Sequence, residues 1–279
     1  MDNKKYAKDY TFQELMIVCA AREVRNGDVS FIGTGLPFLA VALAHATHAP
    51  DVVMCCEQGH IGADPLRWRT PRNIGDAAMC AGAKMSTDLM GVMSRLTSGE
   101  FDLGFLSGAQ VDKYGNMNST SIGDYHKPKV RFPGSGGANV IATFAKRTVL
   151  IFVHKKQTFV EHVDYLTSPG YLSGPGVREK CGMKPETGPV AAITTMGVLR
   201  FDQDTKEMYL DTLHPNVELE DVKNNTGWDL KVSPNLSATE PPTEEEIKII
   251  REELDPYSIY LKREEFQQHA IDFLFSNGS

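Results

Sequence analysis

The stretch VVMCCEQGH, residues 52–60, joins an apolar run to a glutamate, a glutamine and a glycine. Its first residues, 52–54, are typical of a strand that is buried on both faces, and such strands belong to parallel sheets covered by helices. A carboxylate is out of place inside such a strand. We therefore expect the strand to end near Cys56 and Glu57 to stand at its carboxyl end, where open α/β sheets place their chemistry. On this segment alone, a solvated Glu57 that starts a loop is the alternative.

Apolar segments of strand type and of helix type alternate around this stretch. Strands are expected at residues 29–35, 52–56, 101–108 and 148–154. Helices are expected at residues 11–24, 36–49 and 140–147, with one or two more within 76–97. This alternation predicts an α/β fold with an open, mostly parallel sheet flanked by helices and connected in the right-handed sense.

The C-terminal part of the sequence has a different order. Residues 191–201 and 207–213, separated by the polar DQDTK, predict an antiparallel hairpin. The last helices are expected at residues 216–228 and 243–254.

The composition limits the classes of partner. The 279 residues include 36 Asp and Glu against 29 Lys and Arg, a formal net charge of −7, and the basic residues form no cluster. This argues against a nucleic acid or an anionic membrane surface as partner. No apolar run has the length of a membrane span, and the amino terminus lacks the apolar core of a signal peptide. Five irregularly spaced cysteines are usual for reduced thiols, so we expect a cytoplasmic protein.

The sequence GTGLPF, residues 33–38, lies between a strand and a helix, where a dinucleotide-binding fingerprint would lie. It fails as such a fingerprint because Phe38 occupies the third glycine position and no acidic residue ends a second strand at the required distance. We therefore expect a turn in which the amides of Gly33 and Gly35 meet an oxyanion or simply close the turn. No permanently bound cofactor is expected.

Residues of metal-ligating type are present but badly spaced. His45 and His48 stand three apart on a helix, whereas the metalloprotease signature has its histidines four apart with a glutamate after the first. The cysteines between residues 55 and 80 lack a two-plus-two zinc spacing. We expect no metal.

Cys55 and Cys56 both border the proposed site, so one of them is a candidate nucleophile. Alternation along a strand puts the two side chains on opposite faces, so at most one faces a pocket. The alternative is a buried thiol that packs against a helix. No nucleophile-elbow pattern supports a serine hydrolase.

Residues 109–139 are too rich in Gly, Asn, Ser and Pro for regular elements, so they predict a long loop after a buried strand. Loops of this length inside a compact domain are uncommon and tend to be functional. Within the loop, GSGGAN at 134–139 precedes a helix and can present backbone amides to a carboxylate or a thioester oxyanion. The candidate binding residues of the loop are Ser119, Ser121, Gly134, Gly136, Gly137 and Asn139.

Eight motifs follow one another along the chain: GTGLP, EQG, GAQVDKYGNMNSTSIGDY, GSGGANVIAT, DYLTSPGY, GPGVRE, GVLRFD and NTGWDL. In this order the set resembles the B (β) subunits of family I CoA-transferases of the glutaconate CoA-transferase type, from about residue 10 to 255. The resemblance implies a single β-subunit domain over residues 1–262, followed by a C-terminal extension at 263–279.

The resemblance also implies a reaction. In this family the β subunit supplies a catalytic glutamate followed by Ser-Gly or Asn-Gly, and the matching residue is Glu57. CoA would pass between an acyl-CoA and a short (di)carboxylic acid such as glutaconate, through a glutamyl-CoA thioester on Glu57. Gly59 completes the motif, whereas Gln58 departs from it. We expect the longer side chain of Gln58 to affect either the substrate preference or the position of Glu57.

Coenzyme A is then a substrate, and the family's CoA-binding glycine pattern belongs to the α subunit. We therefore expect an α (A) subunit as partner in a heteromeric assembly. Two other hypotheses remain open: hydrolysis or decarboxylation of a CoA ester on the same scaffold, involving Cys56 or a partner residue, and a regulatory subunit that only binds a CoA ester.

Overall fold

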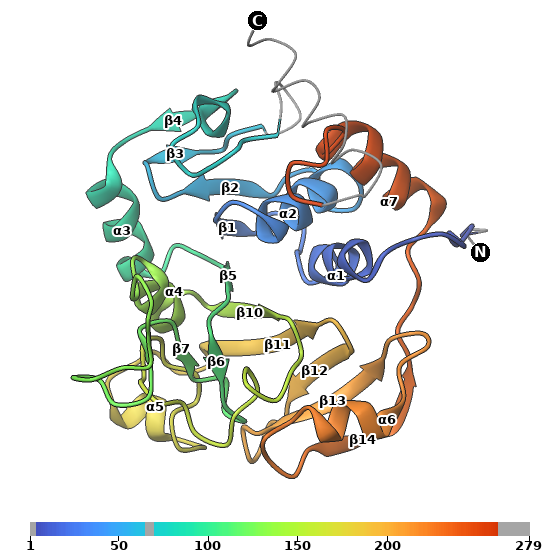
Figure 1. The fold of residues 1–279 in the computed structure, drawn as a ribbon. Helices are drawn as coiled ribbons and strands as arrows, with labels where there is room; N and C mark the ends of the chain where they lie inside the picture. Colours follow the sequence, from blue (N-terminus) through green and yellow to red (C-terminus); the bar gives the residue numbers. More distant parts are fainter. Residues whose placement is uncertain (1–3, 65–69, 262–279) are drawn as a thin grey trace, which may run out of the picture.

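The computed structural model describes residues 4–64 and 70–261, so the expected extension at 263–279 lies outside the described residues. One ten-stranded sheet runs through the described part in the order β14-β13-β12-β11-β10-β5-β1-β2-β3-β4 (Figure 1). Two small two-stranded sheets, β6-β7 and β8-β9, lie outside it.

The centre of the large sheet is parallel. Its five mutually parallel strands are β1 (Val29–Ile32), β2 (Val53–Cys56), β5 (Leu103–Leu106), β10 (Arg147–Phe152) and β11 (Gly188–Thr194). β2 to β4 pair antiparallel at one edge, through β3 (His60–Ile61) and β4 (Met85–Ser86). At the other edge, β12 (Gly197–Phe201) and β13 (Met208–Leu213) are antiparallel, and β14 (Lys231–Ala238) runs parallel to β13. The predicted α/β fold class, with a mostly parallel sheet and a C-terminal antiparallel hairpin, is confirmed.

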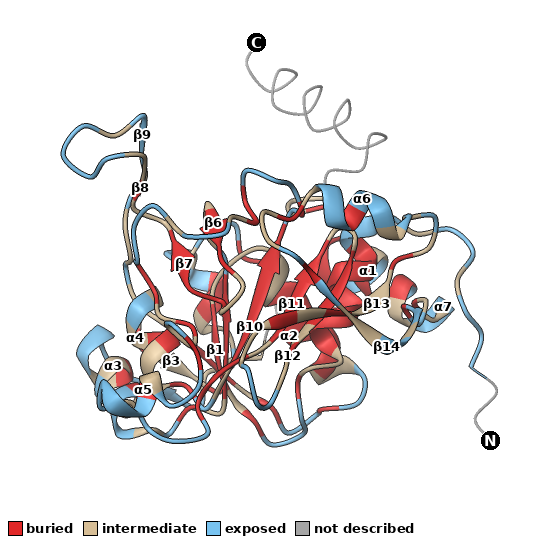
Figure 2. Ribbon diagram, turned by 90° about the horizontal axis from the view of Figure 1, so that it is seen from below, coloured by how far each residue is buried: buried red, intermediate tan, exposed pale blue. Residues whose placement is uncertain are grey.

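Helices cover both faces of the sheet (Figure 1). α1 (Phe12–Ala21) and α2 (Leu36–Ala46) belong to one apolar core, and α3 (Leu89–Ser98) and α4 (Ala138–Phe144) border the other. α2 is almost wholly apolar because α1 and the C-terminal helical turns enclose it against the sheet, and Phe38–Ala44 are buried. Figure 2 shows the strands of the sheet as the most buried part of the molecule.

The first helix begins as the sequence predicts. Thr11 caps α1, and its side chain accepts a hydrogen bond from the amide of Glu14, whose carboxylate in turn accepts one from the Thr11 amide. This reciprocal pair satisfies two amide groups that have no partner within the helix.

Three expectations about the elements need refinement or correction. Of the one or two helices expected within 76–97, one is present as α3, and a short 3₁₀ turn (Ala77–Cys80) and the edge strand β4 precede it. The segment 191–201 is two strands, because the chain turns at 195–196 between β11 and β12. The two expected final helices are shorter than predicted: they are α6 (Leu219–Asn224) and α7 (Glu244–Lys248), and α7 continues as a π-helical turn, η3 (Ile249–Leu254). The strand β14, which lies between α6 and α7, was not predicted. β14 escapes prediction because it is an exposed edge strand of polar composition that contains a proline.

The remaining short elements belong to the long loops. They are β6 (Gln110–Val111), β7 (Met117–Asn118), β8 (Ser121–Ile122), β9 (Val130–Arg131) and α5 (Val177–Lys180). Figure 2 shows the β8-β9 hairpin projecting from the body, with mostly exposed residues.

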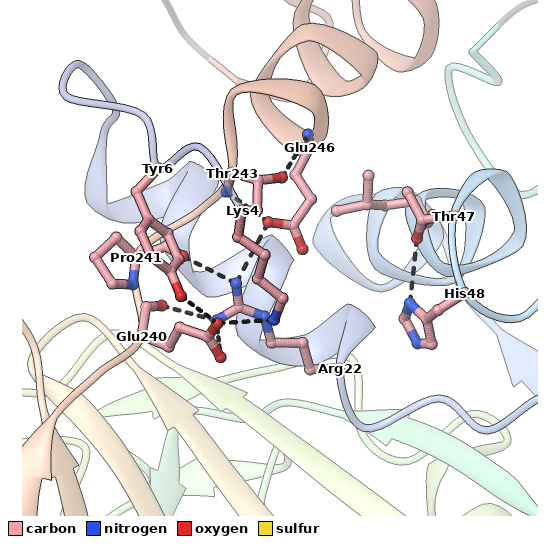
Figure 3. A network of polar contacts seen from close by, with 10 residues as sticks. Lys4, Tyr6, Arg22, Thr47, His48, Glu240, Pro241, Thr243 and Glu246 are labelled. Carbon is pink, nitrogen blue, oxygen red and sulfur yellow. Dashed lines mark hydrogen bonds and ion pairs between the residues drawn. The ribbon is translucent and has the colours of Figure 1, made fainter. Parts of the chain in front are cut away.

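The amino-terminal segment is tied to the region before α7 (Figure 3). Arg22, just after α1, donates to the carbonyl oxygens of Glu240 (2.7 Å) and Pro241 (2.9 Å). Tyr6 and Lys4 donate to the Glu240 carboxylate from the other side, at 2.9 and 3.0 Å. The amino-terminal segment and the segment that leads into α7 therefore lie side by side. Within the described residues, no helix has the length and apolar character needed to cross a membrane.

We predict that Glu14→Gln lowers the free energy of unfolding by about 1 to 3 kcal/mol at neutral pH. Glu14 is 0% exposed and accepts hydrogen bonds from Arg251 at 2.7 and 2.9 Å. Burial opposes its charge, but the bonds from Arg251 and Thr11 outweigh it and lower the pKa of Glu14 below its ordinary 4.5. The carboxylate therefore stabilises the fold above about pH 4.5, and this contribution disappears as the pH falls through the lowered pKa.

Denaturant unfolding at several pH values measures this effect. The control is Glu220→Gln, in an exposed pair with Lys223, which should change stability by less than about 0.5 kcal/mol. Equal effects of the two substitutions at neutral pH would contradict the prediction.

Candidate active site

Glu57 leaves the sheet beside Gly33. β1 and β2 pair in parallel, with Ile32 opposite Cys56, so the next residues of the two strands emerge together at the carboxyl edge of the sheet. Glu57 is partly buried at this edge. The expected end of the strand at Cys56 is thus where the structure places it.

The chain reverses immediately after Glu57. The amide of Gly59 donates to the carbonyl oxygen of Cys56 at 3.0 Å, which closes a turn with Glu57 and Gln58 at its two central positions. Gly59 has a φ of +110°, and a Cβ there would lie 2.2 Å from the carbonyl oxygen of Thr87. Only glycine therefore fits the third position of Glu-Gln-Gly.

The Glu57 carboxylate lies against the start of α4. A Cβ built on Gly137, the N-cap of α4, would be 3.3 Å from Glu57 Oε1 and 2.9 Å from Met93 Cε of α3. Glu57 thus sits on the face of the sheet that α3 and α4 cover. Among the described residues, the Glu57 carboxylate has no hydrogen-bond donor or ion-pair partner, so its oxygens are available for reaction.

Two amides beside this carboxylate are also unused. Within the described part of the chain, the N–H groups of Gly136 and Gly137 donate to no protein acceptor. Gly136 has a φ of +50° and Gly137 a φ of −77°, and successive residues of opposite φ turn their amides toward one concave side. Such a pair of amides is able to receive an anionic oxygen.

Ser119 fixes the start of the glycine segment. Its hydroxyl donates to the carbonyl oxygen of Gly134 at 3.0 Å, and the Gly134 amide donates back to the Ser119 carbonyl oxygen at 3.0 Å. Ser121 is buried in β8, with a hydroxyl that has no described partner. Asn139 is exposed, and its backbone N–H donates to the Ser135 hydroxyl at 3.0 Å. Of these candidates, Ser119 therefore acts on the shape of the loop.

The two glycines of the turn after β1, Gly33 and Gly35, have different places in the structure. Gly33 stands at the strand end beside the Glu57 turn, whereas Gly35 has a φ of +88° and caps α2. The Tyr260 hydroxyl, which donates to the carbonyl oxygen of Pro71, lies close enough to Thr34 and to the Gly35 amide to interact with both. The Gly35 amide therefore faces a hydroxyl of the protein itself.

Cys55 and Cys56 pack into different cores, on opposite faces of β2 as expected from strand alternation. Burial raises the pKa of Cys55 to about 12 and also raises the pKa of Cys56. Cys56 Sγ donates to Gln58 Oε1 at 3.4 Å. Both groups are thus buried thiols, which disfavours either as a nucleophile at neutral pH.

The histidines considered as ligands are occupied or isolated. His48 bonds through Nε2 to the Val24 carbonyl oxygen at 3.0 Å and through Nδ1 to the Thr47 hydroxyl at 3.1 Å. Across residues 4–64 and 70–261, no three His, Cys, Asp or Glu side chains are grouped so as to hold a metal ion.

Met93, whose Cε lies against Gly137 as Glu57 Oε1 does, is the residue of this site that sequence reasoning missed. In the sequence it belongs to a segment rich in Ala, Met and Gly that gives no sign of a site. The only available signal is its position on α3, one residue after buried Val92, on the side of the helix that turns toward α4.

Comparisons with known proteins give relatives that match nearly the whole chain. The chain is 41% identical to the β (B) subunit of glutaconate CoA-transferase from Acidaminococcus fermentans over 259 residues, which are 91% of this chain and 96% of that one. It is 41% identical to the β (B) subunit of 3-oxoadipate CoA-transferase from Pseudomonas knackmussii, over 87% of this chain and 92% of that one.

Solved structures give the same result. The crystal structure of glutaconate coenzyme A-transferase from Acidaminococcus fermentans superposes with a TM-score of 0.86 and 39% identity, over 93% of this chain and 100% of that chain. The decarboxylase AibA/AibB is a more distant neighbour, with a TM-score of 0.76 and 25% identity, over 89% and 96% of the two chains. The family model described as Coenzyme A transferase matches residues 13–225, and the chain belongs to this family.

Proposed function

We propose that this chain is the β subunit of a CoA-transferase and that Glu57 is its covalent nucleophile. The observation that carries the proposal is a carboxylate at the end of β2 that has no partner among the described residues, beside the Gly136 and Gly137 amides, which have no described acceptor. The substrate class is an acyl-CoA and a short carboxylic or dicarboxylic acid, since the relatives at 41% identity are named for glutaconate and 3-oxoadipate.

The chemistry proceeds in balanced steps. A Glu57 oxygen attacks the thioester carbonyl of the acyl-CoA, and the C–S bond breaks to give an acyl-glutamyl anhydride and CoA thiolate. The thiolate attacks the glutamyl carbonyl, which releases the first acid as its carboxylate and leaves a glutamyl-CoA thioester. The acceptor acid repeats both steps in reverse, so the kinetics are ping-pong and Glu57 is regenerated.

The surroundings of Glu57 suit this role. Each attack places negative charge on a carbonyl oxygen, and the Gly136 and Gly137 amides are the donors we assign to it. A nucleophilic carboxylate also has to stay ionised, which full burial would oppose. Glu57 is only partly buried, so the site limits its desolvation.

The proposal includes a partner. The relatives are named as one of two kinds of subunit, and the AibA/AibB neighbour is named with two components, so we infer an α (A) subunit that binds coenzyme A as substrate and completes the site. The five free cysteines suit a reducing compartment, and we place the assembly in the cytoplasm.

We expect Glu57→Gln to lower kcat by a factor on the order of 10⁴ or more, because the amide cannot form the anhydride. The chain is co-expressed with its partner, incubated with acyl-CoA and reduced with borohydride. Mass analysis should then show the Glu57 carboxyl converted to an alcohol. Glu220→Gln serves as the control and should retain both activity and adduct. An active Glu57→Gln enzyme, which a purely regulatory subunit would also give, would sink the assignment.

Gly137→Ala should keep the fold but lower kcat by about 10- to 100-fold. The backbone at residue 137 accepts alanine, yet the new methyl would stand 3.3 Å from Glu57 Oε1 and 2.9 Å from Met93 Cε. Steady-state kinetics of the assembled enzyme measure the effect. Ala138→Gly, which weakens the same helix by roughly 1 kcal/mol without adding an atom near Glu57, should retain kcat. Equal kcat values for the two variants would contradict the prediction.

Multiple turnovers of the acyl-CoA should require an acceptor acid, and the CoA should leave as a thioester of that acid. A transferase holds CoA or the acyl group on Glu57 until a second carboxylate arrives, whereas a CoA-ester hydrolase or decarboxylase turns over without one. Multiple turnovers of acyl-CoA in the absence of added acid would favour the alternative reaction. The burial of Cys55 and Cys56 weakens the feature that first suggested that alternative.

A further inference from the structure

Arg178, in the GPGVRE motif, is the largest fully buried side chain among the described residues, with 1% of its surface exposed. A buried guanidinium is usually paired with a carboxylate, because desolvation of an uncompensated charge is costly. No described carboxylate forms an ion pair with Arg178. Its two terminal nitrogens instead donate to carbonyl and hydroxyl oxygens.

One set of these bonds holds the end of α4. Nη2 of Arg178 donates to the carbonyl oxygens of Ala142 (3.1 Å) and Thr143 (3.4 Å), in the last turn of the helix. The last carbonyls of a helix have no partner within it and carry its partial negative charge, so a cation there is stabilising. The Thr187 hydroxyl accepts from the same nitrogen at 3.1 Å and donates to the Lys184 carbonyl oxygen at 2.7 Å.

The other set holds the loop that supports Ser119. Nη1 of Arg178 donates to the carbonyl oxygen of Gly170 at 2.7 Å and to that of Pro169 at 3.3 Å. Two residues earlier, the Thr167 hydroxyl accepts from the Ser119 amide at 2.9 Å. Ser119 is the residue whose hydroxyl and carbonyl oxygen clamp Gly134.

Both routes from Arg178 lead to the glycine segment beside Glu57. Through α4 it reaches Gly137, at the other end of a seven-residue helix. Through the 167–170 loop it reaches Gly134. α4 packs closely on β5, since a Cβ on Gly104 would lie only 2.3 Å from Ile141 Cγ2, and this leaves the helix little freedom to tilt. The packing does not stop α4 from sliding along its own axis. Contacts at the two ends of the helix have to do so.

We propose that Arg178 is a positioning residue for the nucleophile: it fixes residues 134–137 against Glu57 from both ends of the segment. This rests on the proposed role of Glu57. Glu57 is not among the described hydrogen-bond partners of Arg178, so Arg178 acts through the placement of the Gly136 and Gly137 amides. Lysine cannot replace it, because one ammonium group lacks the planar fork that reaches α4 and the loop together.

The test compares Arg178→Lys with Arg147→Lys in the enzyme assembled with its partner. Arg147 is also largely buried and begins β10, three residues after the end of α4. Its guanidinium donates to Asp28 and to the Glu23 carbonyl oxygen, and among the described residues it bonds to no carbonyl oxygen of α4. Arg178→Lys should lower kcat about 10- to 100-fold and leave KM for acyl-CoA unchanged. The single-turnover rate of glutamyl-CoA thioester formation should fall by the same factor, whereas Arg147→Lys should retain both rates.

Wild-type rates in Arg178→Lys, or equal losses in both variants, would overturn the proposal. If Arg178→Lys does not assemble, Thr187→Val decides, since it removes only one acceptor of the guanidinium and should lower kcat by a smaller factor with KM unchanged. Failure of this inference is distinct from failure of the proposed function: an active Glu57→Gln enzyme refutes the nucleophile, whereas an inactive Glu57→Gln enzyme with a fully active Arg178→Lys enzyme refutes only the positioning role.

Discussion

Strand β2 has to end at Cys56, because the next side chain is a carboxylate and both faces of the sheet are filled by apolar side chains at that level. The turn closed by Gly59 satisfies this constraint within three residues and keeps Glu57 at the sheet edge. A longer loop would instead carry Glu57 into solvent. The parallel pairing of β2 with β1 then fixes what lies beside Glu57. The remaining parts of the site are placed with respect to this carboxylate.

The long loop between β5 and α4 stays ordered without a large sheet because side-chain amides replace the missing backbone partners. Asn118, which is fully buried, donates to Gln110 Oε1 and to the Ser121 carbonyl oxygen, both at 2.7 Å. Asn116 bonds to Asp112 and to the backbone of Gly170 and Leu172. The Asn-rich and Ser-rich composition, which leaves only two-residue strands in this loop, is therefore what holds the loop in one conformation.

The sequence was sufficient for the features that depend on local chemistry. The end of β2 at Cys56, the capping box at Thr11 and the opposite faces of Cys55 and Cys56 all follow from strand or helix geometry. Features that depend on tertiary contacts were beyond it. Met93 reaches Gly137, beside Glu57, only because α3 and α4 pack together, and β14 becomes a strand only because β13 offers it a free edge. Neither contact can be predicted from the periodicity of apolar residues in the sequence.

The placement of positive charge follows from what a nucleophilic carboxylate requires. A guanidinium paired with Glu57 would hold its electron pairs and reduce their reactivity, whereas backbone amides stabilise developing charge without a full positive charge nearby. Arg178 stands instead at the far end of α4, about 10 Å along the helix from Gly137 by its length of seven residues. From there a fixed cation orders the glycine segment through hydrogen bonds to carbonyl oxygens. In the proposed mechanism, Arg178 thus fixes the position of the glycine segment and Glu57 supplies the nucleophile. Because the two groups are separate, the cation does not weaken the nucleophile.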